Sequence, residues 1–262
     1  MSTYRELPPP AVLADWVCCA WVSSRSGGAR ILPDGCVDLV WTGRRLIVAG
    51  PATESHMATE APGATKVGVR FRVGAAGAAL GMPASELRDE NPHAAEVLPA
   101  PVVQRIASSG SDPERMLMAL TGAVSARLRD AEPADPLVRA AARALVAPDA
   151  RVRTVAERLG LSERQLRRRF EDAVGYGPKV LARVLRLQRF LQLATSAGGA
   201  GAGGAGDGGL SRLAFDAGYA DQAHLTRECA ALTGVTPGAL LAERRAPAGD
   251  AELRALALAS AA

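Results

Sequence analysis

The sequence contains no apolar run that approaches the ~20 residues an α-helix needs to cross a bilayer. Its first residues, MSTYRELPPPAVLADW, have no basic segment leading into an apolar stretch, as a secretory leader would. These two absences predict a cytoplasmic protein with no membrane partner. The 262 residues, 48% hydrophobic and 22% charged, have an ordinary globular composition and suffice for two folded domains.

Residues that bind metals or perform redox chemistry are also scarce. The 3 histidines stand far apart, and the 4 cysteines include an adjacent pair but no C-x-x-C spacing. We therefore interpret Cys18, Cys19, Cys36 and Cys229 as buried thiols rather than as metal ligands or redox centres. No metal, no cofactor and no catalytic residue is expected.

Positive charge is concentrated in one part of the chain. Residues 1–133 carry 13 Lys+Arg against 14 Asp+Glu, whereas residues 134–248 carry 17 against 11, a net charge of +6. Sixteen of those seventeen cations are arginine, which suits bidentate contacts to phosphate and guanine but also follows the Ala/Gly/Arg-rich bias of the sequence. Charge alone therefore does not distinguish a nucleic-acid surface from a solvated one.

The first third of the chain has the pattern of short strands divided by turns. The apolar or β-branched runs are residues 17–22, 36–41, 46–49 and 66–71, with a turn expected at residues 26–28. From Ala75 onward the apolar spacing becomes helical, most clearly over 113–129. We expect a mixed two-domain fold in which residues 1–132 form a small antiparallel β unit with appended helices.

The segment AEPADP, residues 131–136, combines two prolines with acidic residues and marks the expected boundary before an all-α domain over 133–246. Within that domain, residues 195–209 contain eight glycines and no large apolar side chain, so we expect a flexible loop there. No function is expected for the tail, residues 247–262.

A helix-turn-helix is predicted at about residues 152–174, in the string TVAERLGLSERQLRRRFEDAVGYGP. Gly160 permits the turn, and Ser162 with Gln165 three residues later is the pattern of a capping box that begins a second helix. At helical spacing, Leu166 and Phe170 fall on one face of that second helix. The opposite face carries three arginines, Arg164, Arg167 and Arg168.

Such a division suits a helix in the major groove of DNA, because arginine bonds to guanine or holds phosphates while the apolar face packs inward. The alternative is a structural helix with a solvated cationic face. A second copy of the motif makes that alternative less favoured.

The second copy is GLSRLAFDAGYADQAHLTRECAALTGVTP, residues 209–237, which predicts a helix-turn-helix at about 210–233. Several of its residues lie 59 positions after their counterparts in the first copy, for example Gly234 after Gly175. Its outward face is neutral and hydrogen-bonding rather than cationic, and comprises Gln222, Ala223, His224, Thr226 and Arg227. Glutamine suits adenine and arginine suits guanine, so this copy is expected to contact bases while the first contributes more of the electrostatic attraction. A metal-binding or catalytic role for the histidine is disfavoured, since no partner residue stands at ligand spacing.

Between the copies, residues 178–194 predict a linker helix that begins at Pro178. Seventeen residues at ~1.5 Å each span roughly 25 Å. Such a helix could hold two recognition helices near the ~34 Å repeat of the major groove, so that one monomer contacts two successive turns of DNA.

With these motifs, the segment from about 137 to 245 resembles the DNA-binding domain of AraC/XylS-type transcription regulators, most specifically in the string AFDAGYADQAHLTRE…TGVTP. The resemblance implies base contacts from Arg164, Arg167 and Arg168 in the first copy, and from Gln222, Ala223, Thr226 and Arg227 in the second. The complete set of candidate DNA-binding residues is Ser162, Arg164, Gln165, Arg167, Arg168, Gln222, Ala223, His224, Thr226 and Arg227. Two departures stand out: Cys229 replaces a usual phenylalanine, and the glycine-rich connection is longer than usual, which puts a fixed angle between the two halves in doubt.

The N-terminal strings ILPDGCVDLVW, VAGPAT and KVGVRFRVGAAGAALGMPASEL are similar to sensor domains that precede this kind of DNA-binding domain. The resemblance implies a cupin-like β structure, here without the cupin metal ligands. Trp41, Arg70 and Phe71 could line an effector pocket, although a place in the core is the better interpretation of each.

The function expected from these motifs is a non-enzymatic, sequence-specific and effector-responsive transcription regulator. Its expected partners are double-stranded DNA, a small-molecule effector in the N-terminal domain, a second copy of the chain, and RNA polymerase if it activates transcription. One alternative is a DNA-binding protein without sequence preference. A less favoured one is a DNA-repair alkyl acceptor that uses Cys36, since Asp34 and Asp38 beside it would raise the pKa of the thiol.

Overall fold

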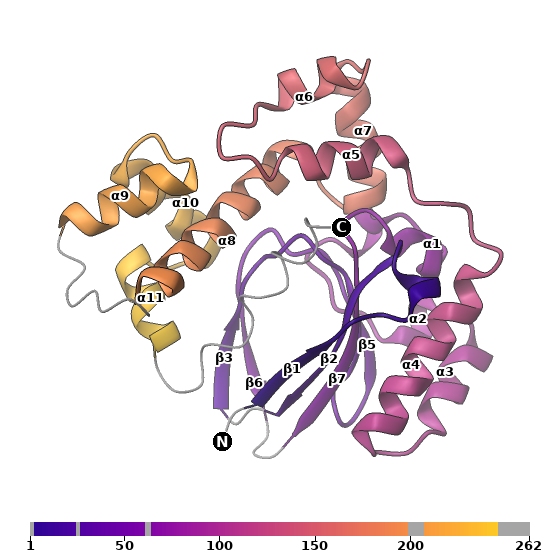
Figure 1. Ribbon diagram of the computed structural model, residues 1–262. Coiled ribbons are helices and arrows are strands. Elements are labelled where there is room, and N and C mark those ends of the chain that lie inside the picture. Colours follow the sequence, from indigo (N-terminus) through magenta and orange to yellow (C-terminus); the bar gives the residue numbers. More distant parts are fainter. Residues whose placement is uncertain (1–2, 25–26, 61–63, 199–206, 246–262) are drawn as a thin grey trace.

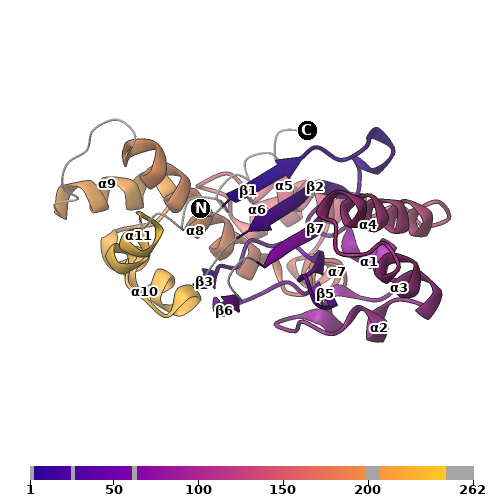
Figure 2. The ribbon, with the colours of Figure 1, turned by 90° about the horizontal axis from the view of Figure 1, so that it is seen from below.

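The computed structural model describes residues 3–24, 27–60, 64–198 and 207–245. An N-terminal antiparallel β domain is followed by a helical C-terminal domain, which confirms the mixed two-domain fold (Figure 1). The strands lie between helices α1 to α4 on one side and helices α8 to α11 on the other (Figures 1 and 2). None of the described helices is long and apolar enough to cross a membrane.

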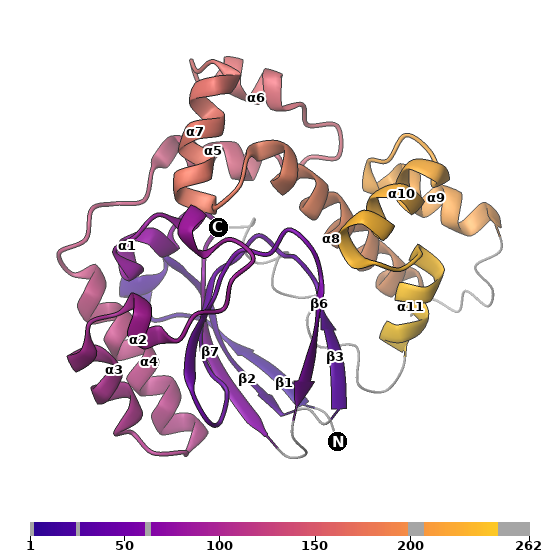
Figure 3. The same cartoon turned by 180° about the vertical axis from the view of Figure 1, so that it is seen from behind.

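The β domain contains a five-stranded sheet and a separate two-stranded ribbon. The sheet has the order β1-β2-β7-β4-β5, and every neighbouring pair is antiparallel. Its strands are β1 (Thr3–Leu7), β2 (Val17–Ser24), β4 (Asp38–Trp41), β5 (Leu46–Ala49) and β7 (Thr65–Phe71). The ribbon pairs β3 (Gly27–Ile31) with β6 (His56–Glu60) and stands on the side of the domain that faces α8 and α11 (Figures 1 and 3).

Four of these strands match the predicted runs, but β1, β3 and β6 were not predicted. The expected turn at residues 26–28 is wrong for its described residues, because Gly27 and Gly28 belong to β3. The short strands β1, β3 and β6 lack the long alternation of apolar residues that identifies a strand in sequence. Their pairing depends on partners far along the chain instead.

Helices cover one face of the sheet and complete the core of the β domain. These elements are η1 (Ala11–Leu13), α1 (Ala76–Leu80), η2 (Ala84–Leu87), α2 (Ala94–Val97), α3 (Ala100–Ala107) and α4 (Pro113–Leu128). Met116 and Leu120 of α4 are fully buried against a sheet that contributes Val67, Val69 and Phe71. Phe71 is therefore a core residue, and Trp41 packs at the edge of the same cluster.

A buried ion pair ties two central strands together. The Arg70 guanidinium donates to both carboxylate oxygens of Asp38, with Nε to Oδ1 at 3.0 Å and Nη2 to Oδ2 at 3.0 Å. Asp38 also accepts from the indole of Trp21 at 3.0 Å, and Arg70 lies 3.3 Å from Asp34. Arg70 is thus committed to these carboxylates, which favours the structural interpretation over an effector contact.

The helical domain contains α5 (Pro136–Ala144), α6 (Val152–Arg158), α7 (Glu163–Val174), α8 (Pro178–Gly198), α9 (Asp207–Ala217), α10 (Gln222–Thr233) and α11 (Pro237–Arg245). It has two cores that share helix α8. Leu181 and Leu185 of α8 pack with α5, α6 and α7, whereas Leu187 and Leu191 pack with α9, α10 and α11. The linker helix is therefore confirmed, and it joins the two halves by contributing to both cores.

The expected flexible loop at residues 195–209 is wrong at both ends. Residues 195–198 continue α8, and residues 207–209 begin α9. Each residue added to a helix that is already nucleated gains one backbone hydrogen bond, and the Thr195 hydroxyl donates to the Leu191 carbonyl at 3.0 Å. Residues 199–206 and the tail at 247–262 lie outside the described residues.

Candidate nucleic-acid interface

Helices α6 and α7 form the first helix-turn-helix, as predicted. Gly160 between them has a φ of 68°, a left-handed conformation that glycine adopts without strain. At the start of α7, the backbone N–H of Gln165 donates to Ser162 Oγ at 3.2 Å, and the backbone N–H of Ser162 donates to Gln165 Oε1 at 2.9 Å. The capping box is therefore confirmed. Contact of these two side chains with DNA stays a prediction.

The two faces of α7 differ as the sequence indicated. Leu166 and Phe170 are fully buried in the core of this half. Arg164, Arg167 and Arg168 are exposed. Arg167 forms an i,i+4 ion pair with Glu171 on the same helix at 2.7 Å. The other two arginines form no ion pair with any residue that the structure describes, so their guanidiniums are available to a partner.

Helices α9 and α10 form the second helix-turn-helix. Asp221 caps α10 by accepting from the backbone N–H of His224 at 2.6 Å. Gln222 accepts from the Ser211 hydroxyl at 2.8 Å, and the Thr226 hydroxyl donates to the Gln222 carbonyl at 2.9 Å.

Two further candidates on α10, Ala223 and Arg227, are exposed on its surface. The predicted polar face of α10 is therefore at least partly accessible to solvent. Its contacts with bases stay a prediction.

His224 is more involved in the local structure than the other candidates on α10. Its ring meets that of Tyr219 edge-on at 5.3 Å, and its Nε2 lies 3.4 Å from Glu228. Glu228 also pairs with Arg186 at 3.0 Å and Arg183 at 3.3 Å, both on α8. This network fixes α10 against the linker helix. The i,i+4 spacing of His224 and Glu228 is visible in the sequence, whereas the two arginines come together with them only in the fold.

Helix α7 comes directly before α8, and α10 packs along α8 where Glu228 pairs with Arg183 and Arg186. Both end at a left-handed glycine, Gly175 with φ 95° and Gly234 with φ 73°. Each half thus contains, in the same order, a capping residue, a recognition helix and a left-handed glycine that ends the helix.

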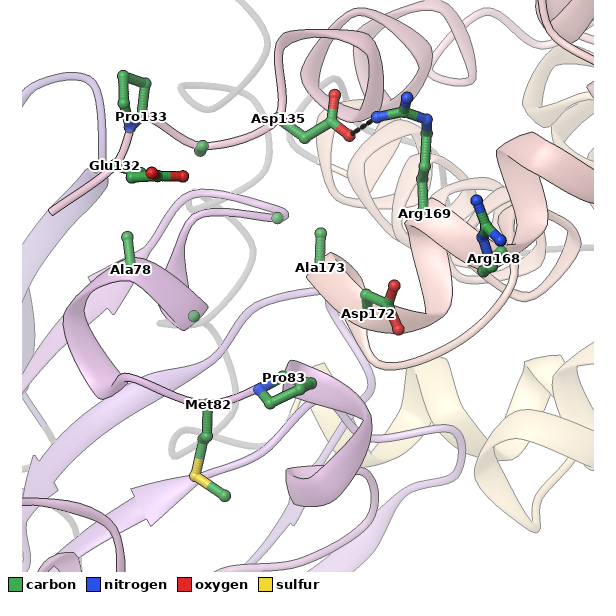
Figure 4. Close-up of a pocket in the computed structure, with 13 residues that line it drawn as sticks. Ala78, Met82, Pro83, Glu132, Pro133, Asp135, Arg168, Arg169, Asp172 and Ala173 are labelled. Carbon is green, nitrogen blue, oxygen red and sulfur yellow. Dashed lines mark hydrogen bonds and ion pairs between the residues drawn. The ribbon is translucent and has the colours of Figure 1, made fainter.

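A cavity of ≈ 570 Å³ lies where α7 meets the β domain. Ala78, Met82 and Pro83 line it from the β domain, while Arg168 and Asp172 line it from α7 (Figure 4).

The wall of this cavity includes an ion pair between the interdomain segment and α7. The pair joins Asp135 Oδ2 to Arg169 Nη1 at 2.6 Å (Figure 4). Burial opposes ionisation of Asp135, but hydrogen bonds from Arg169 and from the backbone of Leu137 outweigh it and lower the pKa of that carboxyl. The cavity therefore adjoins an ion pair that holds the segment leading into α5 against α7.

Cys36 lacks the surroundings of a nucleophile. It is 6% exposed, and burial, together with the nearby Asp34 carboxylate, raises the pKa of its thiol well above the ordinary value. No group of three or more His, Cys, Asp or Glu residues in the described part of the chain has the arrangement of a metal site.

Residues 155–243 match the family model described as a helix-turn-helix domain, which spans both motifs and the linker helix. Residues 155–243 of the chain therefore form a helix-turn-helix domain of the AraC type. Residues 5–93 match a domain of unknown function, DUF6597.

Among solved structures, the chain is similar to ToxT from Vibrio cholerae O395, with 10% identity, a TM-score of 0.43, and coverage of 85% of this chain and 96% of that one. A second structure of ToxT from Vibrio cholerae has 9% identity and a TM-score of 0.37, with coverage of 93% and 98%. No curated protein matches the chain significantly.

Proposed function

We propose that this protein is a sequence-specific regulator in which α7 and α10 occupy two successive segments of the major groove. The observation that carries the proposal is the doubled motif, with two capped helices of matching build that present polar faces from one shared linker helix. Residues 133–246 are assigned to DNA, and residues 1–132 to sensing. Such a regulator acts where the chromosome is, in the cytoplasm of a bacterial cell.

The 21 residues of α8 give it a length of roughly 32 Å at ~1.5 Å per residue. This length is close to the ~34 Å that separate successive major-groove segments on one face of DNA. A linker helix of this length lets both halves pack on it, as the two cores that share α8 show.

The test begins with selection of bound duplexes from random or genomic fragments, followed by sequencing. A recurring motif of two half-sites is expected, with affinity well above that for random duplex at physiological salt. Equal affinity for selected and random duplexes would favour the alternative of a binder without sequence preference.

Arg227 is the sharpest single probe of base contact. Arg227→Ala should cost about 1–3 kcal/mol of binding on the selected duplex and relax base preference at one position. Arg105→Ala, which removes an exposed arginine from α3, is the matched control and should leave both unchanged. An unchanged footprint for Arg227→Ala would refute its role.

The arginine face of α7 is expected to supply phosphate contacts. Replacing Arg164, Arg167 and Arg168 by alanine should reduce the slope of log affinity against log salt by up to ~3 units, because each phosphate contact releases about one counterion. The ion pair of Arg167 with Glu171 leaves the other two as the stronger contributors. An unaltered slope would show that these residues are not phosphate contacts.

The effector site is proposed to be the cavity beside α7, since a ligand there would touch the β domain, the interdomain segment and a recognition helix together. Ala173→Trp should fill the cavity. A metabolite panel screened by thermal shift should then contain a compound that stabilises the wild type and not this variant. A compound that stabilises both equally would place its site elsewhere.

The remaining partners are a second copy of the chain and, for an activator, RNA polymerase. Sedimentation of the complex with DNA measures the number of copies bound. Transcription from a selected promoter distinguishes activation from repression.

A further inference from the structure

The β3–β6 ribbon, the part of the β domain outside its main sheet, contacts the second helix-turn-helix directly. Leu32, the residue after β3, is 7% exposed and belongs to the core that Leu187, Phe190 and Leu191 of α8 form with α9 and α10. Next to it, the Gln188 side chain donates to the Pro33 carbonyl at 2.7 Å. The segment that leaves the ribbon is therefore part of the second core.

The ribbon also caps the C-terminal end of α10. Arg30 Nη1 donates to the Thr233 carbonyl at 2.8 Å, and the Ser55 hydroxyl donates to the same carbonyl at 2.9 Å. The backbone N–H of Ser55 donates to the Leu232 carbonyl at 2.8 Å. The last carbonyls of a helix have no partner within it, and a cation is favoured at that end. Arg30 of β3 and Ser55, the residue before β6, thus satisfy the end of a recognition helix.

Arg30 extends this contact to α11. Its Nε lies 2.9 Å from Glu243 Oε2, and its Nη2 lies 3.2 Å from Oε1, a bidentate pair. The Arg30 side chain is 19% exposed, so one guanidinium joins α10, α11 and the ribbon in a partly desolvated position.

The first recognition helix is held elsewhere. At its C-terminal end, Gly175 packs against Pro51 and Ala84, and the following Tyr176 is buried. The β domain therefore contacts the C-terminal ends of both helices through different elements. In this class of motif the N-terminal residues of such a helix contact base edges.

We propose that the β3–β6 ribbon positions the second recognition helix on DNA, with Arg30 as the positioning residue, so that movement of the ribbon changes the contacts of α10 without those of α7. This proposal rests on the proposed function, since it assigns a control element to one of its two DNA-contacting helices. Arg30 acts through α10 and does not itself touch DNA.

The test is hydroxyl-radical footprinting of the full chain on a duplex selected by the wild type. The half of the footprint that belongs to α10 is the half weakened by Arg227→Ala. Arg30→Ala should weaken protection of that half by about fivefold, the effect of losing a few partly exposed hydrogen bonds, and leave the α7 half unchanged. Arg30→Lys, which keeps the charge at the end of α10, should restore part of the protection.

Two further variants separate positioning from general stability. Arg44→Ala removes an exposed arginine from the turn between β4 and β5 and should leave both halves intact. Glu243→Gln weakens the same ion pair from the α11 side. It should weaken protection of the α10 half of the footprint by less than Arg30→Ala does, and it tests the ion pair even if Arg30→Ala does not fold. Thermal melts by circular dichroism ensure that each footprint is taken on folded protein.

Equal loss over both halves, or an unchanged footprint for folded Arg30→Ala and Glu243→Gln, would overturn the positioning role. Failure of the wild type to protect any selected duplex would instead overturn the proposed function, and this proposal with it.

Discussion

The two glycines that end the recognition helices provide a matched pair of substitutions that measures the contact between the domains. Gly175 and Gly234 both have a left-handed backbone, with φ of 95° and 73°. A Cβ added at Gly234 would have no heavy atom within 4 Å, whereas one at Gly175 would lie 2.5 Å from Pro51 Cγ and 2.9 Å from the Ala84 carbonyl oxygen. Gly234→Ala therefore tests backbone strain alone. Gly175→Ala tests backbone strain together with a steric clash against the β domain.

The magnitudes follow from these distances. Placing alanine in a left-handed conformation costs about 1–2 kcal/mol, and this is the whole expected loss for Gly234→Ala. At Gly175 the backbone of Ala84 cannot move aside as a flexible side chain would, so overpacking adds about 1–3 kcal/mol. Gly175→Ala should then lose about 2–5 kcal/mol of the free energy of unfolding or of domain association.

Denaturant unfolding can assign the loss to a domain, because all 3 tryptophans, Trp16, Trp21 and Trp41, lie in the β domain. Tryptophan fluorescence therefore follows that domain, and far-ultraviolet circular dichroism weights the helices. Gly175→Ala should shift the fluorescence transition, since it removes contacts from the β domain, and Gly234→Ala should shift chiefly the helical signal. Equal losses in the two variants, with the fluorescence transition unmoved in both, would refute the claim that α7 is packed on the β domain.

Two other substitutions test smaller features. Ser162→Ala removes the cap of α7 and should lower the free energy of unfolding by about 1 kcal/mol; an unchanged melting temperature would contradict the cap. The Arg30 hydrogen bond lowers the pKa of Glu243 from its ordinary value of 4.5. A lowered folded-state pKa gives stability that is present above 4.5 and lost as the pH falls through the folded value. The wild type should therefore lose more stability than Glu243→Gln on acidification from pH 5, as thermal melts across that range would measure, and identical acid profiles would argue against the bridge.

Much of the helical domain could be predicted from the sequence because its signals are local. The capping box of Ser162 and Gln165, and the division of α7 between Phe170 and its exposed arginines, depend on residues three or four positions apart. Such spacings fix the faces of a helix before any tertiary contact forms. The doubled motif and its exposed polar faces were therefore expected, and both are present.

The β domain was predicted less completely, for the opposite reason. The strands β3 and β6 pair with each other across 25 or more positions, and Gly27 and Gly28 indicate a turn when only neighbouring residues are considered. Strand pairing depends on partners far along the chain, and the local sequence pattern does not identify those partners.

The sequence by itself determined which residues form the two recognition helices and which of their side chains face outward, since each helix is specified by its own few turns. Only the tertiary structure decided what holds those helices in place. Arg30 meets Glu243 across 213 positions, and Gln188 meets Pro33 across 155. Contacts of that separation arise from the packing of one domain on another, and no periodicity or motif along the chain encodes them.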